Sequence, residues 1–148
     1  MDSNKYPVKS ALIGRKVTAV RMNDDVLIFE TDQGPVGFRV WGDCCSHSYF
    51  HDFYGLDKLR ENGPVIEFNE ISLPDPEPTR EYDDCVQAYG YEIVTEHKMF
   101  GPQTSVFSFR NSSNGYYGGE MEEFPDWQDI TRLVEETPLL AGDFVVLD

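Results

Sequence analysis

The sequence predicts an α+β fold: a twisted, mostly antiparallel sheet of six to eight strands, either open or partly closed into a barrel. Three observations lead to this prediction. Short segments alternate between apolar and polar residues, as half-buried strands do. Turn-forming residues separate these segments at short intervals. Helical apolar spacing is confined to a segment after the third strand and a short segment near the C-terminus. A chain of 148 residues is expected to form a single domain, 1–148.

The first part of the chain predicts an arm followed by a three-stranded meander. Residues 1–10 contain Pro7 and show no periodicity, so we expect a flexible arm. Asn23-Asp24-Asp25 and Asp32-Gln33-Gly34 are turn signals, and connections this short favour antiparallel neighbours. The expected strands are Lys16–Met22, Val26–Phe29 and Val36–Trp41.

A helix is expected directly after the third strand, over Ser46–Phe53. Asp43 or Ser46 would cap it, and Tyr49, Phe50 and Phe53 would form its apolar stripe. Gly55 would end this helix, and Leu56–Glu61 is expected to add one more helical turn.

The second part of the chain predicts further strands and one more helix. Residues 73–84 hold three prolines and five acidic residues, so we expect an exposed, mobile loop there. Asn111–Gly115 is expected to form a turn. Asp126 would cap a helix over Trp127–Glu135. The expected strands are Val65–Ile71, Val86–Glu96, Thr104–Arg110, an acidic edge strand over Tyr116–Phe124, and Phe144–Leu147.

The charge and composition of the chain argue against some classes of partner and location. The net charge is -15, and residues 22–148 carry 26 acidic against 7 basic groups. Such a surface repels a phosphate backbone, so direct nucleic-acid binding is not expected. No apolar run approaches the ~18 residues of a membrane span, and we expect no secretory signal because the first residues lack an apolar h-region. Three cysteines, an odd number, favour a reduced cytoplasmic setting.

The first unusual motif is Gly42-Asp43-Cys44-Cys45-Ser46, with His47 and His51 after it. A zinc site or a Cys–His nucleophile can be drawn from these residues if they lie on a helix. The spacing matches no known zinc module, and nothing in the sequence orients a histidine. We therefore expect Cys44 and Cys45 to be buried and structural, and we expect no metal, no cofactor and no catalytic residue.

The second unusual motif is Ser113-Asn114-Gly115-Tyr116-Tyr117-Gly118-Gly119. Asn-Gly supplies a turn, but three glycines and two tyrosines exceed what a turn needs. Glycines admit close backbone approach, and tyrosines offer a ring face and a hydroxyl. The motif is typical either of a bulged edge strand or of a site for a planar ligand or a partner protein.

These two motifs, with Tyr89-Gly90-Tyr91, resemble a family of small uncharacterised phage and prophage proteins over about Lys16 to Gly119. That family has no assigned activity, so no catalytic residue carries over. The resemblance implies a phage origin, a location in the host bacterial cytoplasm, and a role in countering host defence. It also marks residues 73–84 and 125–148 as local elaborations.

Three hypotheses for function follow, from three classes. The first is a non-enzymatic sponge that sequesters a small nucleotide-derived immune signal. The second is an acidic inhibitor or DNA mimic that docks on a basic host defence protein. The third is a Cys- or metal-dependent enzyme. The glycine-rich edge strand also predicts a homodimer or higher homo-oligomer.

The first hypothesis predicts a specific ligand site. Bases can stack on tyrosine rings without any positive field, glycine amides can donate to phosphate, and an arginine can add charge-assisted bonds. The expected ligand-binding residues are Asn114, Tyr116, Tyr117 and Gly118, with Arg39 or Arg110 nearby.

Overall fold

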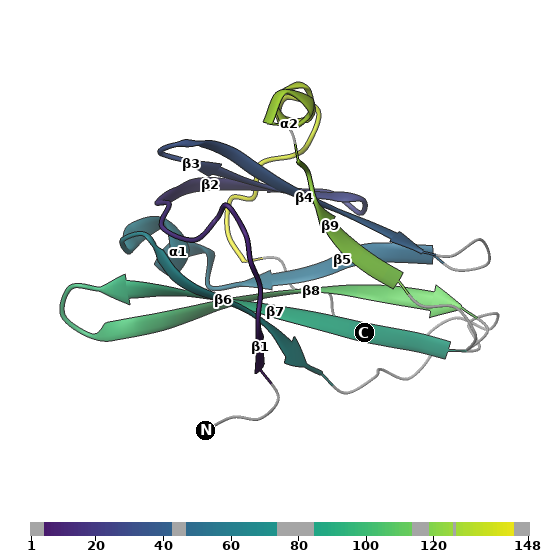
Figure 1. Ribbon diagram of the computed structural model, residues 1–148, viewed down its shortest axis with the longest axis horizontal. Helices are drawn as coiled ribbons and strands as arrows, with labels where there is room; N and C mark the ends of the chain where they lie inside the picture. Colours follow the sequence, from purple (N-terminus) through teal and green to yellow (C-terminus); the bar gives the residue numbers. More distant parts are fainter. Residues whose placement is uncertain (1–4, 43–46, 74–84, 114–118, 126, 144–148) are drawn as a thin grey trace.

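The computed structural model describes residues 5–42, 47–73, 85–113, 119–125 and 127–143. Two antiparallel sheets face each other, and Figure 1 shows them as two layers. The five-stranded sheet has the order β1 (Lys5–Pro7), β6 (Val65–Ser72), β7 (Cys85–His97), β8 (Gly101–Ser113), β5 (His47–Tyr54). The four-stranded sheet has the order β2 (Val17–Met22), β3 (Val26–Thr31), β4 (Gly34–Gly42), β9 (Gly119–Glu123).

Two short helices complete the described fold. Helix α1 (Leu56–Glu61) lies at one end of the two layers, and α2 (Trp127–Val134) lies on the outer side of the four-stranded sheet (Figure 1). A mostly antiparallel protein with a short helix near the C-terminus was therefore predicted correctly. A single sheet or partly closed barrel was not, because nine strands of the described residues form two separate open sheets.

The β2–β3–β4 meander agrees with its prediction. Short connections join antiparallel neighbours, and Gly34 has a φ of 106° at the second turn, which favours glycine. Alternate side chains such as Phe29 and Phe38 point into the core, while Arg39 points outward.

The helix predicted over Ser46–Phe53 is wrong: residues 47–54 form strand β5, paired with β8. The register shifts between Phe50 and Asp52, which marks a β-bulge. The extra residue turns Phe50 and Phe53, three positions apart, to the same buried face. The bulge thus reproduces the apolar spacing of a helix. A second bulge in β6 buries both Val65 and Phe68, which strict alternation would have put on opposite faces.

Both ends of the described chain are attached to the sheets. The first ten residues, expected as a flexible arm, include β1, which pairs with β6. Lys5 Nζ lies 2.9 Å from the buried carboxylate of Glu92. After α2, Leu140 N donates to Val20 O, and Asp143 Oδ1 accepts a 2.9 Å bond from Leu56 N at the start of α1.

Other predicted elements have mixed outcomes. Helix α1 confirms the turn predicted at Leu56–Glu61, and α2 ends one residue before the predicted Glu135. Residues 111–113, expected to begin a turn, continue strand β8. Most of the predicted acidic loop (74–84) and the predicted strand at 144–147 lie outside the described residues.

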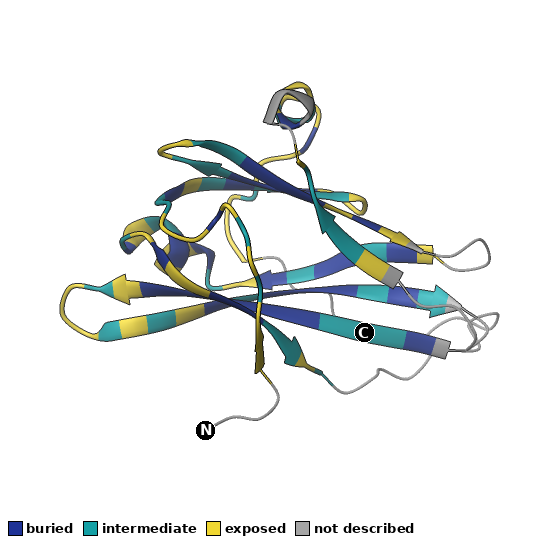
Figure 2. Ribbon diagram, viewed as in Figure 1, coloured by how far each residue is buried: buried dark blue, intermediate teal, exposed yellow. Residues whose placement is uncertain are grey.

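The core between the sheets is rich in aromatic rings, and Figure 2 shows the buried positions along the inner strands. Phe107 lies at its centre, completely buried. Its ring packs against rings of both sheets, those of Phe29, Phe50, Phe53, Phe68 and Tyr91. Among the described residues, no helix has the length and apolar character needed to span a membrane.

Candidate functional site

The structure tests only part of the site predicted from the sequence. Asn114, Tyr116, Tyr117 and Gly118 lie outside the described residues, as do Cys44 and Cys45. Arg39 and Arg110 are described, and they lie on different sheets. Each is next to an inward phenylalanine, so their side chains point to the outer faces of the two layers. One small ligand therefore cannot contact both arginines.

Arg39 is engaged within its own surface. Its guanidinium pairs with the carboxylate of Glu122 on β9, and its central carbon lies 5.3 Å from the centroid of the Phe124 ring. The pair is half exposed, so water screens it. Arg39 therefore supports the packing of the β9 end, where Phe124 begins the connection to α2.

The strand ends that flank the two sequence motifs lie next to each other. Gly42, which precedes the cysteine pair, is the register partner of Gly119, which ends the glycine- and tyrosine-rich motif. On the other sheet, Ser112 pairs with both His47 and Val86. The fold therefore brings the flanks of both motifs to one end of the molecule.

The histidines do not have the arrangement on which the metal and nucleophile hypotheses depended. On a helix, His47 and His51 would be neighbours on one face. On strand β5 the ring of Tyr49 contacts both, stacked on His47 at 5.4 Å and edge-on to His51 at 6.4 Å. Among the described residues, no three His, Cys, Asp or Glu side chains are grouped so that they could hold a metal ion.

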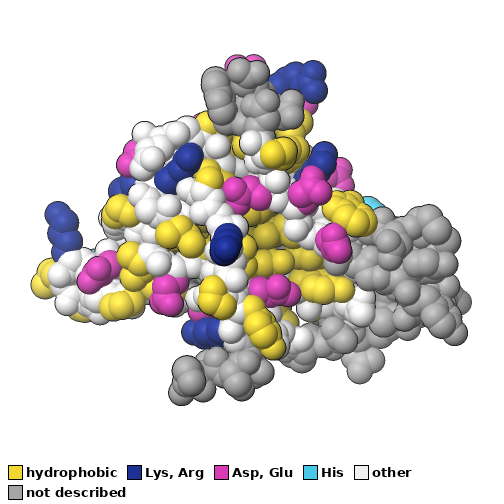
Figure 3. Space-filling view, viewed as in Figure 1, with side chains coloured by type: hydrophobic (Ala, Val, Ile, Leu, Met, Phe, Trp, Pro, Cys, Tyr) yellow, Lys and Arg dark blue, Asp and Glu magenta, His cyan; other side chains and the backbone are white. Residues whose placement is uncertain are grey.

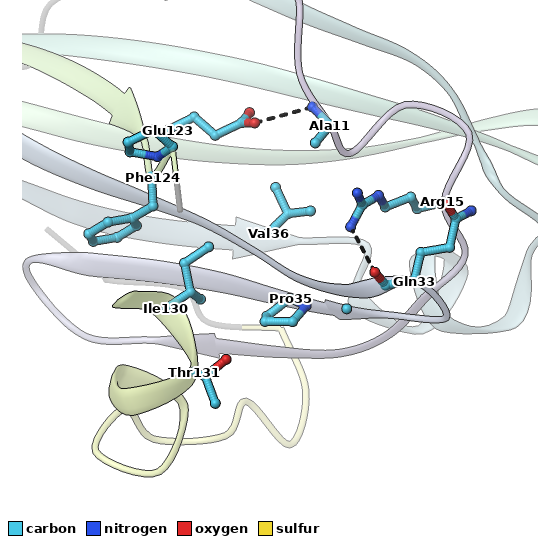
Figure 4. A pocket seen from close by; sticks show the side chains of 11 residues that line it. Ala11, Arg15, Gln33, Pro35, Val36, Glu123, Phe124, Ile130 and Thr131 are labelled. Carbon is cyan, nitrogen blue, oxygen red and sulfur yellow. Dashed lines mark hydrogen bonds between the residues drawn. The ribbon is translucent and has the colours of Figure 1, made fainter. Parts of the chain in front are cut away.

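A hollow of about 490 Å³ lies at the edge of the four-stranded sheet, beneath α2 (Figure 4). Four segments far apart in the sequence surround it: the segment before β2, the β3–β4 turn, the end of β9, and α2. Its walls are mainly apolar, with an arginine and a glutamate among them. The lining residues are Ala11, Arg15, Gln33, Gly34, Pro35, Val36, Glu123, Phe124, Pro125, Ile130 and Thr131.

The sequence of β4 explains why the hollow opens there. Phe124 N donates to Gly37 O, so this side of β4 faces β9. Two residues earlier on the same side, Pro35 has no N–H to offer, so the ladder cannot continue. Gly37 also lets α2 approach: a Cβ at this position would lie 3.0 Å from Phe124 and 3.2 Å from Ile130.

Two charged side chains are held at opposite sides of the hollow (Figure 4). The Arg15 guanidinium donates to Gln33 O at 3.3 Å, the one hydrogen bond that its side chain makes within the described part of the chain. Both carboxylate oxygens of Glu123 are used, one by the Ser10 hydroxyl and one by Ala11 N at 3.2 Å. Arg15 therefore retains N–H donors for a ligand, whereas Glu123 mainly anchors the segment before β2.

Charged and hydrophobic side chains are mixed on the face of the protein drawn in Figure 3. Figure 3 shows Asp and Glu side chains interspersed with hydrophobic ones, and Lys and Arg scattered among them. Arg15 comes from residues 1–21, which carry five Lys and Arg against one Asp in a chain of net charge -15.

Arg15, Phe124 and Ile130 were not predicted as site residues from the sequence. Arg15 belongs to the basic cluster of residues 1–21, which was the available signal. No spacing rule relates it to α2, more than a hundred positions later. The hollow depends on tertiary contacts that a single sequence does not encode locally.

Comparison with known proteins identifies a family for this chain. The profile of the DUF7448 family, described as a domain of unknown function, matches residues 10–122. No curated protein and no solved structure matches the chain. The matched region covers Ala11, Arg15 and the β3–β4 turn, whereas Glu123 to Thr131 follow it. Because the profile spans most of the sequence, the chain belongs to the DUF7448 family of domains of unknown function.

Proposed function

We propose that this protein is a non-enzymatic binding protein that takes up a small, nucleotide-like anion in the hollow beneath α2. The observation that carries the proposal is an apolar hollow of ligand size with an arginine whose donors are largely unused by the part of the chain that the structure describes. The resemblance to phage and prophage proteins suggests the setting, in which the ligand is an immune signal of the bacterial host and binding sequesters it.

The size and walls of the hollow support a small ligand. Sites for small molecules usually measure about 300–1,000 Å³ and combine apolar walls with a few placed polar groups. At about 490 Å³ the hollow falls within that range. Phe124, Pro35 and Ile130 offer surfaces against which a flat ring can pack.

The charges support an anionic group on that ligand. Arg15 can donate two parallel bonds to a phosphate oxygen pair, a geometry that lysine cannot offer. The negative charge of Glu123 lies at the opposite side of the hollow from Arg15, where both of its oxygens are hydrogen-bonded. A phosphate near Arg15 with a base against the apolar wall satisfies both parts of the hollow.

Calorimetric titration of the full chain with mononucleotides, cyclic mononucleotides and cyclic dinucleotides tests the proposal. Arg15→Ala is expected to weaken binding by about 10- to 100-fold, because a hydrogen bond to a charged group contributes about 1.5–3 kcal/mol. Arg132→Ala is the matched control: Arg132 is exposed on α2 and does not line the hollow. The control is expected to bind like the unmodified chain.

Two results would contradict the proposal. One is that no compound in the series binds at millimolar concentration. The other is that a compound binds and Arg15→Ala leaves its affinity unchanged. Mass spectrometry of small molecules released by heating protein from cells with an active defence system extends the test to ligands outside the series.

A second candidate function is docking on a basic host protein. The observation that favours it is the edge strand β9, where exposed Glu120 is the register partner of Trp41, itself 43% exposed. An aromatic beside carboxylates suits a basic partner surface. If so, Glu120→Lys should abolish association with a DNA-binding defence protein and should restore that protein's DNA binding. If the Glu120→Lys variant still blocks DNA binding by the defence protein, that result argues against docking through β9.

A further inference from the structure

A second hollow, of about 270 Å³, adjoins the first around the β3–β4 turn. The two share Gly34, Pro35 and Thr131 as lining residues. A ligand that occupies the first hollow can therefore extend past this turn into the second. The residues that line the second hollow would then determine which chemical group is accepted at the far end of the ligand.

The charged groups of the second hollow are carboxylates. Glu30 lies on β3 and Glu135 follows α2. Arg21 Nε donates to Glu30 Oε2 at 3.2 Å. No described residue donates a hydrogen bond to the other carboxylate oxygen of Glu30, Oε1. Glu135 is exposed, and within the described part of the chain its carboxylate has no bonding partner. Ionised carboxylates accept hydrogen bonds and cannot donate them.

The two adjoining hollows differ in the polar groups that they leave for a ligand. In the first hollow Arg15 offers donors, while both oxygens of Glu123 already accept hydrogen bonds from Ser10 and Ala11; in the second hollow Glu30 and Glu135 offer acceptors. From this polarity we infer that the ligand carries its anionic group at the Arg15 end and a base with an exocyclic amino group at the Glu135 end. This inference rests on the proposed function, and it narrows the ligand class to amino-bearing bases such as guanine, adenine or cytosine.

Guanine is the base that suits this end best. Its N1–H and 2-amino group form adjacent donors that match the two oxygens of one carboxylate. Hypoxanthine keeps N1–H and lacks the amino group, and uracil presents an acceptor where cytosine presents its amine. A site that hydrogen-bonds an amine discriminates against the analogue without it, because its own polar groups are then left unpaired.

Matched ligand pairs test the inference. The probes are GMP against IMP, CMP against UMP, and cyclic di-GMP against cyclic di-IMP, titrated by calorimetry into the full chain. The amino-bearing member is expected to bind about tenfold more tightly. Glu135→Gln is expected to reduce that preference to about twofold or less by weakening the amino-bearing member alone. Glu136→Gln removes the neighbouring exposed carboxylate, which does not line either hollow, and is expected to keep the preference.

The outcomes separate the two proposals. Binding that depends on Arg15 but is equal within each pair would overturn the inference and leave the proposed function standing. A preference that survives Glu135→Gln unchanged would also overturn it. Absence of binding by every probe would overturn the proposed function, and the inference with it.

Discussion

At the residue scale, burial changes the acid–base behaviour of Tyr91. Tyr91 is 8% exposed, and its ring stacks on that of Phe107 with 5.3 Å between the centroids. Burial raises the pKa of the Tyr91 phenol well above the usual value of 10.0, and the nearby charges of Glu70 and Tyr89 add to the effect. The folded protein therefore retains this proton at a pH where the unfolded chain releases it.

This shift predicts a loss of stability in alkali. Below pH 10 the folded and the unfolded chain both keep the Tyr91 proton, so this group does not change the free energy of unfolding with pH. Above pH 10 only the unfolded chain loses the proton, so the free energy of unfolding falls. The slope is about 1.4 kcal/mol per pH unit for one group. Tyr91→Phe should remove this contribution, so urea unfolding of the variant should change less between pH 8 and pH 11 than that of the unmodified chain. Tyr54→Phe, at a 42% exposed position, is the matched control, and an equal pH dependence in both variants would contradict the account.

At the element scale, the β7–β8 hairpin presents two apolar side chains on an ordered turn. Met99 and Phe100 are 82% and 74% exposed. His97 Nδ1 accepts hydrogen bonds from Met99 N at 3.0 Å and Phe100 N at 3.1 Å, and its ring stacks on Phe100 at 4.7 Å. One imidazole thus fixes the backbone of the turn while the tip remains in contact with solvent.

His97→Ala should loosen this turn without unfolding the protein. The variant removes two acceptor contacts, each contributing about 0.5–1.5 kcal/mol. Amide hydrogen exchange at Met99 and Phe100 should accelerate about tenfold, while strands β7 and β8 keep their protection. Lys98→Ala in the same turn is the control. Unchanged exchange at both amides in His97→Ala would show that the turn does not depend on the imidazole.

The strands illustrate what a sequence pattern can and cannot predict. The β2–β4 meander was predicted because each turn is short and carries Gly34 or Asn23-Asp24-Asp25 at its centre. Strand β5 was mistaken for a helix because a bulge puts Phe50 and Phe53 on one face. Bulges follow from the pairing partner, and the partner strand β8 lies more than fifty residues later.

At the scale of the whole molecule, Phe107 connects the two sheets. Its centroid lies 6.0 Å from that of Phe29 on the opposite sheet and 6.0 Å from that of Phe53 on its own. Phe107→Ala should lower the free energy of unfolding by about 3–5 kcal/mol, because it removes a fully buried ring and leaves a cavity. Phe100→Ala, which truncates the same side chain at an exposed position, should change it by about 0.5 kcal/mol or less. Urea unfolding measures the change in the free energy of unfolding for both variants. Similar losses of stability in the two variants would contradict the described core.

The candidate site could not be predicted from the sequence for a related reason. The sequence motifs drew attention to Asn114–Gly118 and the cysteine pair, whose flanking strand ends do meet. The hollow beneath α2 instead joins Arg15, Pro35 and Ile130, residues with no shared motif. What brings them together is the end of β9 pairing at Phe124 and the return of the chain as α2.

The central claim is that the hollow beneath α2 is the ligand site, and mapping amide chemical shifts by NMR tests it most directly. The chain would be titrated with the tightest-binding nucleotide of the calorimetric series. We predict that the largest shift changes occur at Ala11, Val36 and Thr131, which surround the hollow. Changes concentrated instead at Gly42, His47 and Ser112, the strand ends that flank the two motifs, would contradict it and move the site to that end of the molecule.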